Sequence, residues 1–105
     1  VGFVPIRKAG KLPGAVIKRD YGLEYGSDIL EMQVDALSRV KDPKVLLIDD
    51  VLATGGTLIA ALELISDLAG ELCEVAVLLE IRALGGRERI LAAFPQLRIR
   101  ALVQI

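Results

Sequence analysis

Thirteen consecutive residues, Val45–Thr57 (VLLIDDVLATGGT), carry the groups best suited to chemistry in this sequence. Two carboxylates, Asp49 and Asp50, follow an apolar run, and a loop of small residues with two glycines comes next. Glycines let the backbone curl so that successive N–H groups point into one cavity, which is how a protein cradles a phosphate. Carboxylates beside such a cradle would repel the phosphate, but they can accept hydrogen bonds from neighbouring sugar hydroxyls. The segment therefore predicts a site for a sugar 5-phosphate.

A strand before this loop and a helix after it would position these groups. The apolar run Val45–Ile48 predicts a strand that is buried on both faces. Apolar residues then recur at helical spacing, at Leu58, Leu62, Ile65 and Leu68. This spacing predicts an amphipathic helix over Thr57–Ala69, with Gly70 as its stop. Ligands of open α/β sheets bind beyond the carboxyl ends of the strands, where a helix dipole and the hydroxyls of Thr54 and Thr57 would add to the phosphate cradle.

An acidic pair and a glycine-rich turn can also simply end a strand and cap a helix. For Asp49 and Asp50 alone, this plain interpretation is about as reasonable as the functional one, whereas the full thirteen residues favour the phosphate site. Competing phosphate motifs fit poorly, because the chain contains neither G-x-x-x-x-G-K-[ST] nor G-x-G-x-x-G.

The first third of the chain predicts a short strand, a loop and a hairpin. Val1–Arg7 is the short strand, although Pro5 weakens it, and Lys8–Gly14 is the loop. Two strands, Ala15–Tyr21 and Asp28–Asp35, form the hairpin, and the second alternates apolar and polar residues. The polar, glycine-flanked tip between them, at residues 22–26, is expected to be mobile.

The last third of the chain continues the alternation of strands and helices. Val75–Leu79 is another buried strand, Gly85 and Gly86 introduce a helix over Arg87–Ala93, and Leu97–Ile105 alternates as a half-exposed strand. This order predicts right-handed crossovers and a parallel sheet in an α/β fold.

The composition limits the classes of function. A length of 105 residues allows one small domain, and 4% aromatic residues imply an aliphatic core. The net charge of −1 gives no support for nucleic-acid binding. With no histidine, and with Cys73 as the one cysteine, internal disulfides, thiolate metal clusters and Ser-His pairs are excluded. Cys73 is expected to pack at the start of a strand.

No apolar run reaches the roughly 20 residues of a membrane span, so we expect a cytoplasmic protein.

The segment Val45–Thr57 resembles the motif by which type I phosphoribosyltransferases bind 5-phosphoribosyl 1-pyrophosphate (PRPP). Three further segments are similar to stretches of the adenine phosphoribosyltransferases, so the resemblance covers nearly the whole chain. These are VPIRKAGKLPG (Val4–Gly14), YGLEYG (Tyr21–Gly26) and LGGRER (Leu84–Arg89). The resemblance implies a single phosphoribosyltransferase domain over residues 1–105. Its parallel-sheet core would have helices on both faces, an antiparallel flexible catalytic hairpin at about residues 12–33, and the PRPP motif at residues 45–57.

The resemblance also assigns roles in PRPP binding and catalysis. Asp49 and Asp50 would bind the ribose 2- and 3-hydroxyls, and Asp50 is also expected to take part in catalysis. The 5-phosphate would be held by five consecutive residues, Ala53, Thr54, Gly55, Gly56 and Thr57.

The remaining implied roles belong to the pyrophosphate and to the closing loop. Arg7, with Lys8 nearby, would meet the pyrophosphate, because a guanidinium fork matches phosphate oxygens; without the family, a solvated strand end is the better interpretation. Lys11 is either a phosphate contact or a solvated charge. Glu24 would transfer a proton to or from the purine nitrogen, or is a plain loop acid. Tyr25 would shield the pyrophosphate or pack the closed loop.

The implied reaction transfers phosphoribosyl from PRPP to adenine, giving AMP and pyrophosphate, in a homodimer. Magnesium would be held mainly by PRPP and water, so no metal ligand is assigned. A regulatory module that binds PRPP without catalysis and an inactive fragment are the alternatives, and the Glu24–Tyr25 loop favours catalysis.

The family has more chain before the position of Val1. That region supplies an interior strand, a pyrophosphate loop and the hood that recognises the base, so the sequence leaves base specificity open. Because the chain opens without methionine, we expect a fragment or a processed chain. Loss of an interior strand would leave open sheet edges, so the 105 residues alone are expected to be marginally stable, dependent on a partner or inactive.

Overall fold

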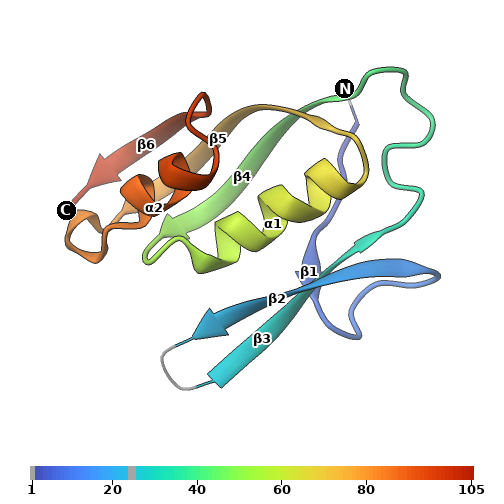
Figure 1. Ribbon diagram of the computed structural model, residues 1–105, viewed down its shortest axis with the longest axis horizontal. Coiled ribbons are helices and arrows are strands. Elements are labelled where there is room, and N and C mark those ends of the chain that lie inside the picture. Colours follow the sequence, from blue (N-terminus) through green and yellow to red (C-terminus); the bar gives the residue numbers. More distant parts are fainter. Residues whose placement is uncertain (1, 24–25) are drawn as a thin grey trace.

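The computed structural model describes residues 2–23 and 26–105, which form two sheets on either side of a central helix (Figure 1). The first sheet is antiparallel, with the order β1-β3-β2. It consists of β1 (Arg7–Lys8), β2 (Val16–Leu23) and β3 (Gly26–Gln33). The expected hairpin is confirmed, with strands that extend further toward its tip. The strand expected over residues 1–7 is reduced to Arg7–Lys8, and Pro5, which has no N–H to donate to a ladder, lies just before it.

The second sheet is parallel, with the order β4-β5-β6, as the alternation of strands and helices predicted. Its strands are β4 (Lys44–Leu52), β5 (Glu71–Glu80) and β6 (Arg98–Gln104). The crossovers contain α1 (Gly56–Asp67), a short 3-10 helix (Arg82–Leu84) and α2 (Gly86–Ala93). Both expected α-helices are confirmed to within about one turn.

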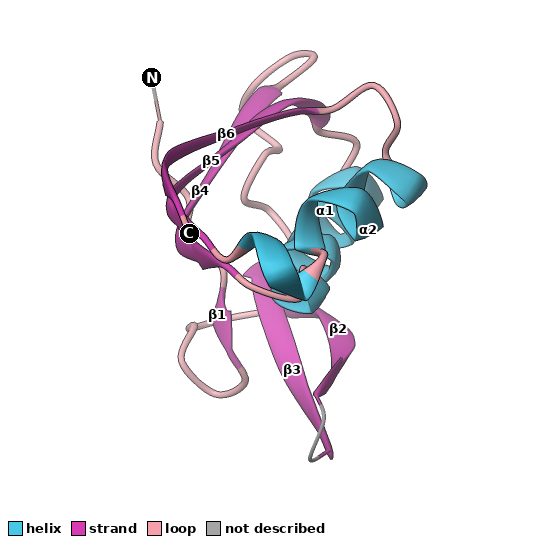
Figure 2. Ribbon diagram, turned by 90° about the vertical axis from the view of Figure 1, so that its left-hand side faces the viewer, coloured by secondary structure: helices cyan, strands magenta, loops and turns pink. Residues whose placement is uncertain are grey.

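Both α-helices lie on the same side of the parallel sheet (Figure 2), where helices on both faces were expected. Alternate residues of β4, such as Val45 and Leu47, pack into the core, while Ile48 on the other face is 69% exposed. Leu78 of β5, in a segment that was also expected to be buried, is 58% exposed. The expectation that β4 is buried on both faces is therefore wrong for the described residues, because no layer of them covers this second face. Cys73, expected to be packed, is also exposed.

Helix α1 belongs to two hydrophobic clusters, one on each side of it. One cluster lies against the parallel sheet and α2, and the other against the antiparallel sheet. The first contains Leu52, Leu58, Leu62, Val75, Val77, Ile90, Leu97 and Ile99. The second contains Tyr21, Leu30, Met32, Ala60, Ala61, Leu64 and Ile65. Apolar burial on both sides fixes α1, and with it the loop from which it starts.

A charged contact adds to the link between the hairpin and α1. The guanidinium of Arg19 on β2 donates a hydrogen bond to the carboxylate of Asp67, and its Nε lies 3.6 Å from Glu63 Oε2. Both acids lie near the end of α1, away from the β4–α1 loop. The middle of β2 is therefore tied to the second half of α1.

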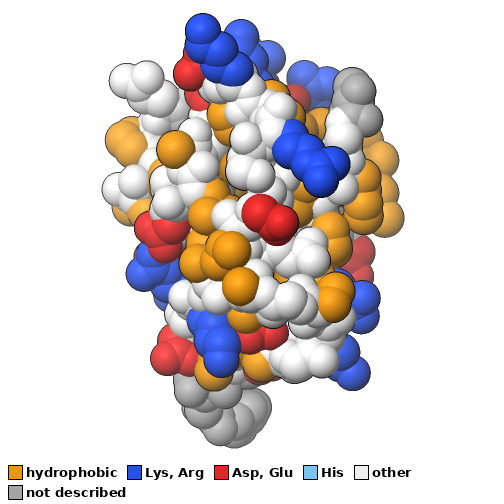
Figure 3. Space-filling view, turned by 90° about the vertical axis from the view of Figure 1, so that its right-hand side faces the viewer, with side chains coloured by type: hydrophobic (Ala, Val, Ile, Leu, Met, Phe, Trp, Pro, Cys, Tyr) orange, Lys and Arg blue, Asp and Glu red, His pale blue; other side chains and the backbone are white. Residues whose placement is uncertain are grey.

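The molecular face shown in Figure 3 carries no block of one charge. Lys and Arg side chains alternate there with Asp and Glu, and apolar atoms lie between them. This mixture is unlike the continuous basic face of nucleic-acid-binding domains. Within residues 2–23 and 26–105, no helix has both the length and the apolar character needed to cross a membrane.

Helix α1 ends in a Schellman motif, and its left-handed residue is Ala69 rather than the expected Gly70. Ala69 has φ 61°, the amide of Gly70 donates to Ile65 O (3.0 Å), and the amide of Ala69 donates to Ser66 O (3.0 Å). Gly70 serves close packing instead. A Cβ at this position would lie 2.7 Å from Ile65 Cγ2 and 2.9 Å from Leu37 Cδ1.

Replacing Ala69 by glycine is expected to stabilise the fold, because glycine adopts the left-handed conformation without the strain that alanine carries there. We expect a gain of about 0.5–1 kcal/mol in the free energy of unfolding, measured by chemical denaturation. The control is Ala92→Gly on the exposed face of α2, which should cost about 0.5–1 kcal/mol. A loss of stability in the Ala69→Gly variant would contradict the strain argument.

Candidate phosphate and sugar site

The two acids of the motif lie within β4 rather than after its end. The strand was expected to end at Ile48, but its pairing with β5 continues through Leu52. β4 is the edge strand of the parallel sheet as described, so some of its amides have no neighbouring strand. The amide of Asp50 donates to Asp49 Oδ1 (2.8 Å), and the amide of Val51 donates to Asp50 Oδ1 (2.8 Å). These local hydrogen bonds fix both carboxylates near the carboxyl end of the sheet.

Neither carboxylate has a cation as partner among the described residues, where all ion pairs involve other acids. Partial burial raises the pKa of the Asp49 carboxyl, and the side chain of Asp50 adds to the rise. The ionised form of Asp49 is therefore disfavoured in the unliganded chain, and a ligand that donates hydrogen bonds to it, or a cation, would offset this cost. This electrostatic situation suits sugar hydroxyls.

The loop after β4 turns sharply at Gly55, which has φ 91° and ψ −7°, and no side chain in the described part of the chain caps the helix that follows. The first hydrogen bond of α1 runs from the amide of Ile59 to Gly55 O (2.9 Å). The amides of residues 56–58 thus have no acceptor within the helix, and they lie at the positive end of its dipole. These are the properties of an anion-binding helix start.

A small cavity of about 60 Å³ opens at this turn. It is lined by Val51, Ala53, Thr54, Gly55, Thr57 and Leu58. Four of the five residues predicted to hold the 5-phosphate therefore surround one hollow. The fifth, Gly56, is buried as the first residue of α1.

The start of α2 packs directly against the back of this loop, through a contact between glycines. A Cβ on Gly86 would lie 2.3 Å from Ala53 O and 2.7 Å from Leu52 Cδ1. A Cβ on Gly55 would lie 3.0 Å from Gly86 O. Sequence reasoning identified Gly86 only as the start of a helix. The doubled glycine was the available signal, since one residue supplies the turn and the other the close approach.

The predicted pyrophosphate residues lie on and beside β1, on the antiparallel sheet. Arg7 and Lys11 are exposed. Lys8 Nζ lies 3.2 Å from Asp28 Oδ2, and this hydrogen bond raises the pKa of the Lys8 ammonium. Within the described chain, no hydrogen bond or ion pair joins these three cations to the phosphate loop. Their pyrophosphate role stays a prediction.

Glu24 and Tyr25, the predicted catalytic residues of the hairpin tip, lie outside the described residues. The end of β2 and the beginning of β3, which flank them, lie at the same end of the molecule as the β4–α1 loop (Figure 1). The described ends of these two strands therefore lie on the side of the molecule that holds the phosphate loop.

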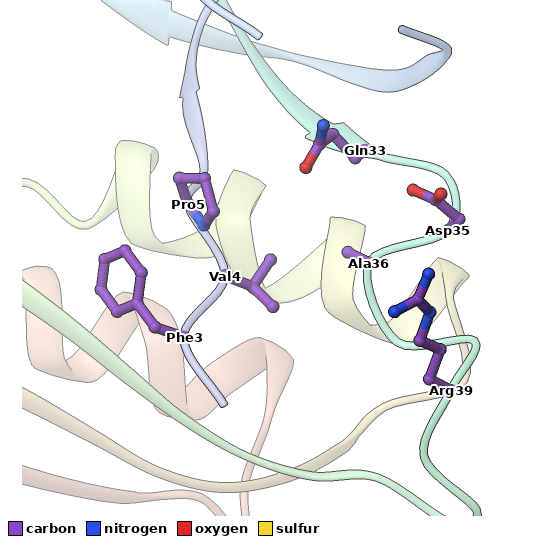
Figure 4. A pocket seen from close by; sticks show the side chains of 7 residues that line it. All are labelled: Phe3, Val4, Pro5, Gln33, Asp35, Ala36 and Arg39. Carbon is purple, nitrogen blue, oxygen red and sulfur yellow. The ribbon is translucent and has the colours of Figure 1, made fainter. Parts of the chain in front are cut away.

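A second, larger hollow of about 230 Å³ lies between the N-terminal segment and the residues after β3 (Figure 4). Its lining combines Phe3, Val4 and Pro5 with Gln33, Asp35, Ala36 and Arg39. Phe3 is 91% exposed, so this hollow is open to solvent. It holds neither a glycine-rich turn nor a helix start, so the smaller cavity is the better candidate for binding a phosphate.

Comparisons with known proteins identify the family of this chain. The model of the phosphoribosyl transferase domain matches residues 6–96. An adenine phosphoribosyltransferase from a Synechococcus species is 56% identical over 87 residues, which are 83% of this chain and 49% of the relative. The one from Streptomyces avermitilis is 50% identical over 105 residues, which are 100% of this chain and 57% of the relative.

Solved structures of adenine phosphoribosyltransferases also superpose on this chain. The adenine phosphoribosyltransferase of Thermoanaerobacter pseudethanolicus superposes with a TM-score of 0.89 at 39% identity, over 100% of this chain and 58% of that one. The Trypanosoma brucei enzyme, in complex with AMP, pyrophosphate and ribose-5-phosphate, gives 0.82 at 32% identity, over 97% of this chain and 46% of that one. The chain thus spans about half the length of these relatives. By the match over residues 6–96, it belongs to the phosphoribosyl transferase domain family.

Proposed function

We propose that this chain is the PRPP-binding part of an adenine phosphoribosyltransferase, which transfers phosphoribosyl from PRPP to adenine in purine salvage. The observation that carries the proposal is the cavity lined by Ala53, Thr54, Gly55 and Thr57, beside two carboxylates that have no cation partner among residues 2–23 and 26–105. The names of the relatives, and the AMP and ribose-5-phosphate in the Trypanosoma brucei structure, support the choice of substrates.

In this proposal the site works mainly by positioning. The loop amides and the dipole of α1 hold the 5-phosphate, while Asp49 and Asp50 accept hydrogen bonds from the ribose hydroxyls. The sugar is thereby fixed at both ends. A ring nitrogen of adenine then forms its bond to the anomeric carbon as the bond to pyrophosphate breaks, and the two carboxylates stabilise positive charge on the ribose ring.

The remaining roles belong to the cations of β1 and to the hairpin tip. Arg7 is the stronger candidate for the pyrophosphate, since Lys8 is already paired with Asp28. Lys11 adds positive charge nearby in sequence. Glu24 would move the proton of the purine nitrogen, and Tyr25 would shield the pyrophosphate when the hairpin closes and excludes water.

Magnesium fits the donor chemistry of this site, because Asp49 and Asp50 are oxygen donors without a cation partner in the described chain. The ion would be held mainly by oxygens of PRPP and by water, with the two carboxylates accepting hydrogen bonds from that water. When bound, it would neutralise charge on the departing pyrophosphate. A homodimer in the cytoplasm completes the proposal, and analytical ultracentrifugation tests the dimer.

The test is AMP formation from PRPP and adenine by the purified chain, run beside calorimetric titration with PRPP. Turnover supports the enzyme. PRPP binding without turnover would favour a regulatory module instead. A chain that melts cooperatively yet binds no PRPP would contradict the proposal, whereas a chain that shows no cooperative melting would match the inactive fragment.

The pKa of Asp49 predicts how PRPP binding depends on pH. Only the ionised carboxylate accepts hydrogen bonds from both hydroxyls, and burial raises its pKa. Affinity should therefore fall on acidification while ordinary aspartates are still ionised. The unliganded fold should not weaken over the same range, because a raised pKa means that protonation of Asp49 favours the folded state.

Calorimetry at several pH values measures this effect. The Asp49→Asn variant is the control, because it keeps the ionisation of the PRPP phosphates and removes that of Asp49. We expect its affinity to be lower and its pH dependence flatter than in the wild type. Identical pH profiles for the two proteins would rule out Asp49 as the titrating acceptor.

A further inference from the structure

A buried carboxylate at the end of β5 is gripped by an arginine from the start of α2. The side chain of Glu80 is 4% exposed. Arg87 Nη2 donates to Glu80 Oε1 (2.7 Å), and Arg87 Nε lies 3.1 Å from Oε2. Arg87 Nη1 donates to Ile99 O (2.9 Å), and Gln104 Nε2 donates to Glu80 Oε1 (2.9 Å). One guanidinium therefore ties the first turn of α2 to both β5 and β6.

This contact is ionic and has a fixed geometry. The hydrogen bonds from Arg87 hold the pKa of Glu80 below its usual range, and those to Glu80 raise the pKa of Arg87. Two donors of the planar guanidinium meet the two carboxylate oxygens, an arrangement that fixes orientation as well as distance. A lysine in place of Arg87 would keep the charge but lose the fork.

The residue before Arg87 is the glycine that backs the phosphate loop. Gly86 leaves no room for even a methyl group between itself and Ala53 O, and its own carbonyl lies against Gly55. A shift of the first turn of α2 would therefore move the loop, because nothing between them can absorb it. The ion pair fixes the position of Gly86, and Gly86 in turn fixes the position of residues 53–55.

We propose that the Glu80–Arg87 pair is a positioning device for the phosphate cradle. Arg87 is a positioning residue, since it acts through Gly86 on the loop of Ala53–Gly55 and contacts Glu80 and Ile99 rather than the cavity. The inference rests on the proposed function, because it gives the ion pair a purpose only if this loop binds the 5-phosphate.

The experiment compares Arg87→Met and Arg87→Lys with the wild type. Arg89→Met is the matched control, with the same change on the same helix at an exposed residue. Ribose 5-phosphate binding is measured by calorimetry, and kcat and KM for PRPP are measured where turnover is present. Melting curves report folding for every protein.

Arg87→Met is expected to weaken ribose 5-phosphate binding about tenfold or more and to raise KM for PRPP by a similar factor. The kcat should change much less, because the 5-phosphate is held alike in the ground and transition states. Arg87→Lys should recover part of the affinity, and Arg89→Met should match the wild type. In the unliganded proteins, the amide chemical shifts of Gly55 and Thr57 should differ from their wild-type values in Arg87→Lys but not in Arg89→Met.

If the ion pair had only a structural role, its loss in the Arg87 variants would lower the melting temperature and leave the affinity of the folded protein for ribose 5-phosphate unchanged. That result would overturn the inference. If Arg87→Met does not fold, Arg87→Lys decides by the same criterion. Wild-type protein that binds no ribose 5-phosphate would overturn the proposed function and this inference together. Wild-type binding with unchanged affinity in the folded variants would overturn the inference alone.

Discussion

Replacing Gly86 by alanine is expected to weaken ribose 5-phosphate binding at least about tenfold, although residue 86 does not line the cavity. The new methyl group would stand 2.3 Å from the carbonyl oxygen of Ala53 and 3.0 Å from the amide nitrogen of Gly55. Both are backbone atoms of the phosphate loop, so the strain must move either this loop or α2. Overpacking of this kind also costs about 1–3 kcal/mol of stability.

Gly85→Ala is the matched control, one residue away. Gly85 has φ 71°, and a Cβ there would meet nothing within 4 Å. Alanine at this position should therefore cost about 1 kcal/mol of backbone strain without displacing the loop. Calorimetry with ribose 5-phosphate and melting curves on both variants separate the two effects. Equal affinities for Gly86→Ala and Gly85→Ala would contradict the proposed contact.

Replacing Asp49 and Asp50 together by asparagine is expected to lower kcat/KM for PRPP by about 10²–10⁴. A hydrogen bond to a charged group contributes about 1.5–3 kcal/mol, and two such acceptors would be lost. Asparagine keeps the shape of the side chain but removes the negative charge that stabilises the ribose ring in the transition state. Steady-state kinetics with varied PRPP provide the measurement.

The melting temperature of this double variant shows whether Asp49 and Asp50 serve ligand binding or stabilise the fold. Burial raises the pKa of Asp49, so the ionised carboxylate is unfavourable in the folded chain. Its neutral replacement should leave the melting temperature unchanged or higher. Asp35→Asn, at an exposed position after β3, is the control and should retain wild-type kinetics. A double variant with near-normal kcat/KM would refute the sugar-binding role.

The local features of the site could be predicted from the sequence because they depend on neighbouring residues. Two acids, a turn that needs a left-handed glycine and an apolar helix follow one another within Val45–Ala69, and the structure places them in that order. The carboxyl end of β4 could not be located, since it depends on hydrogen bonds to β5, far away in sequence. Asp49 and Asp50 therefore lie inside the strand rather than after it.

Features set by tertiary contacts were missed for the same reason. The run Val45–Ile48 presents apolar side chains to both faces of β4, but whether a layer covers each face depends on how the helices are arranged in the fold. The approach of Gly86 to Ala53 joins residues from two crossovers. The contact of Arg87 with Glu80 likewise joins a helix to a strand end. The pair Gly85–Gly86 indicated the start of a helix, but neither it nor the charge of Arg87 indicated which residues would be contacted.

The phosphate cradle at the start of α1 is tested most directly by titrating the ¹⁵N-labelled chain with ribose 5-phosphate and, separately, with ribose. We expect ribose 5-phosphate to cause the largest changes in amide chemical shift at Thr54–Leu58, with smaller changes at Asp49 and Asp50. Ribose should leave the shifts of Thr54–Leu58 almost unchanged. Shifts confined to the hollow near Phe3 and Arg39, or equal shifts with both ligands, would contradict a phosphate cradle at the start of α1.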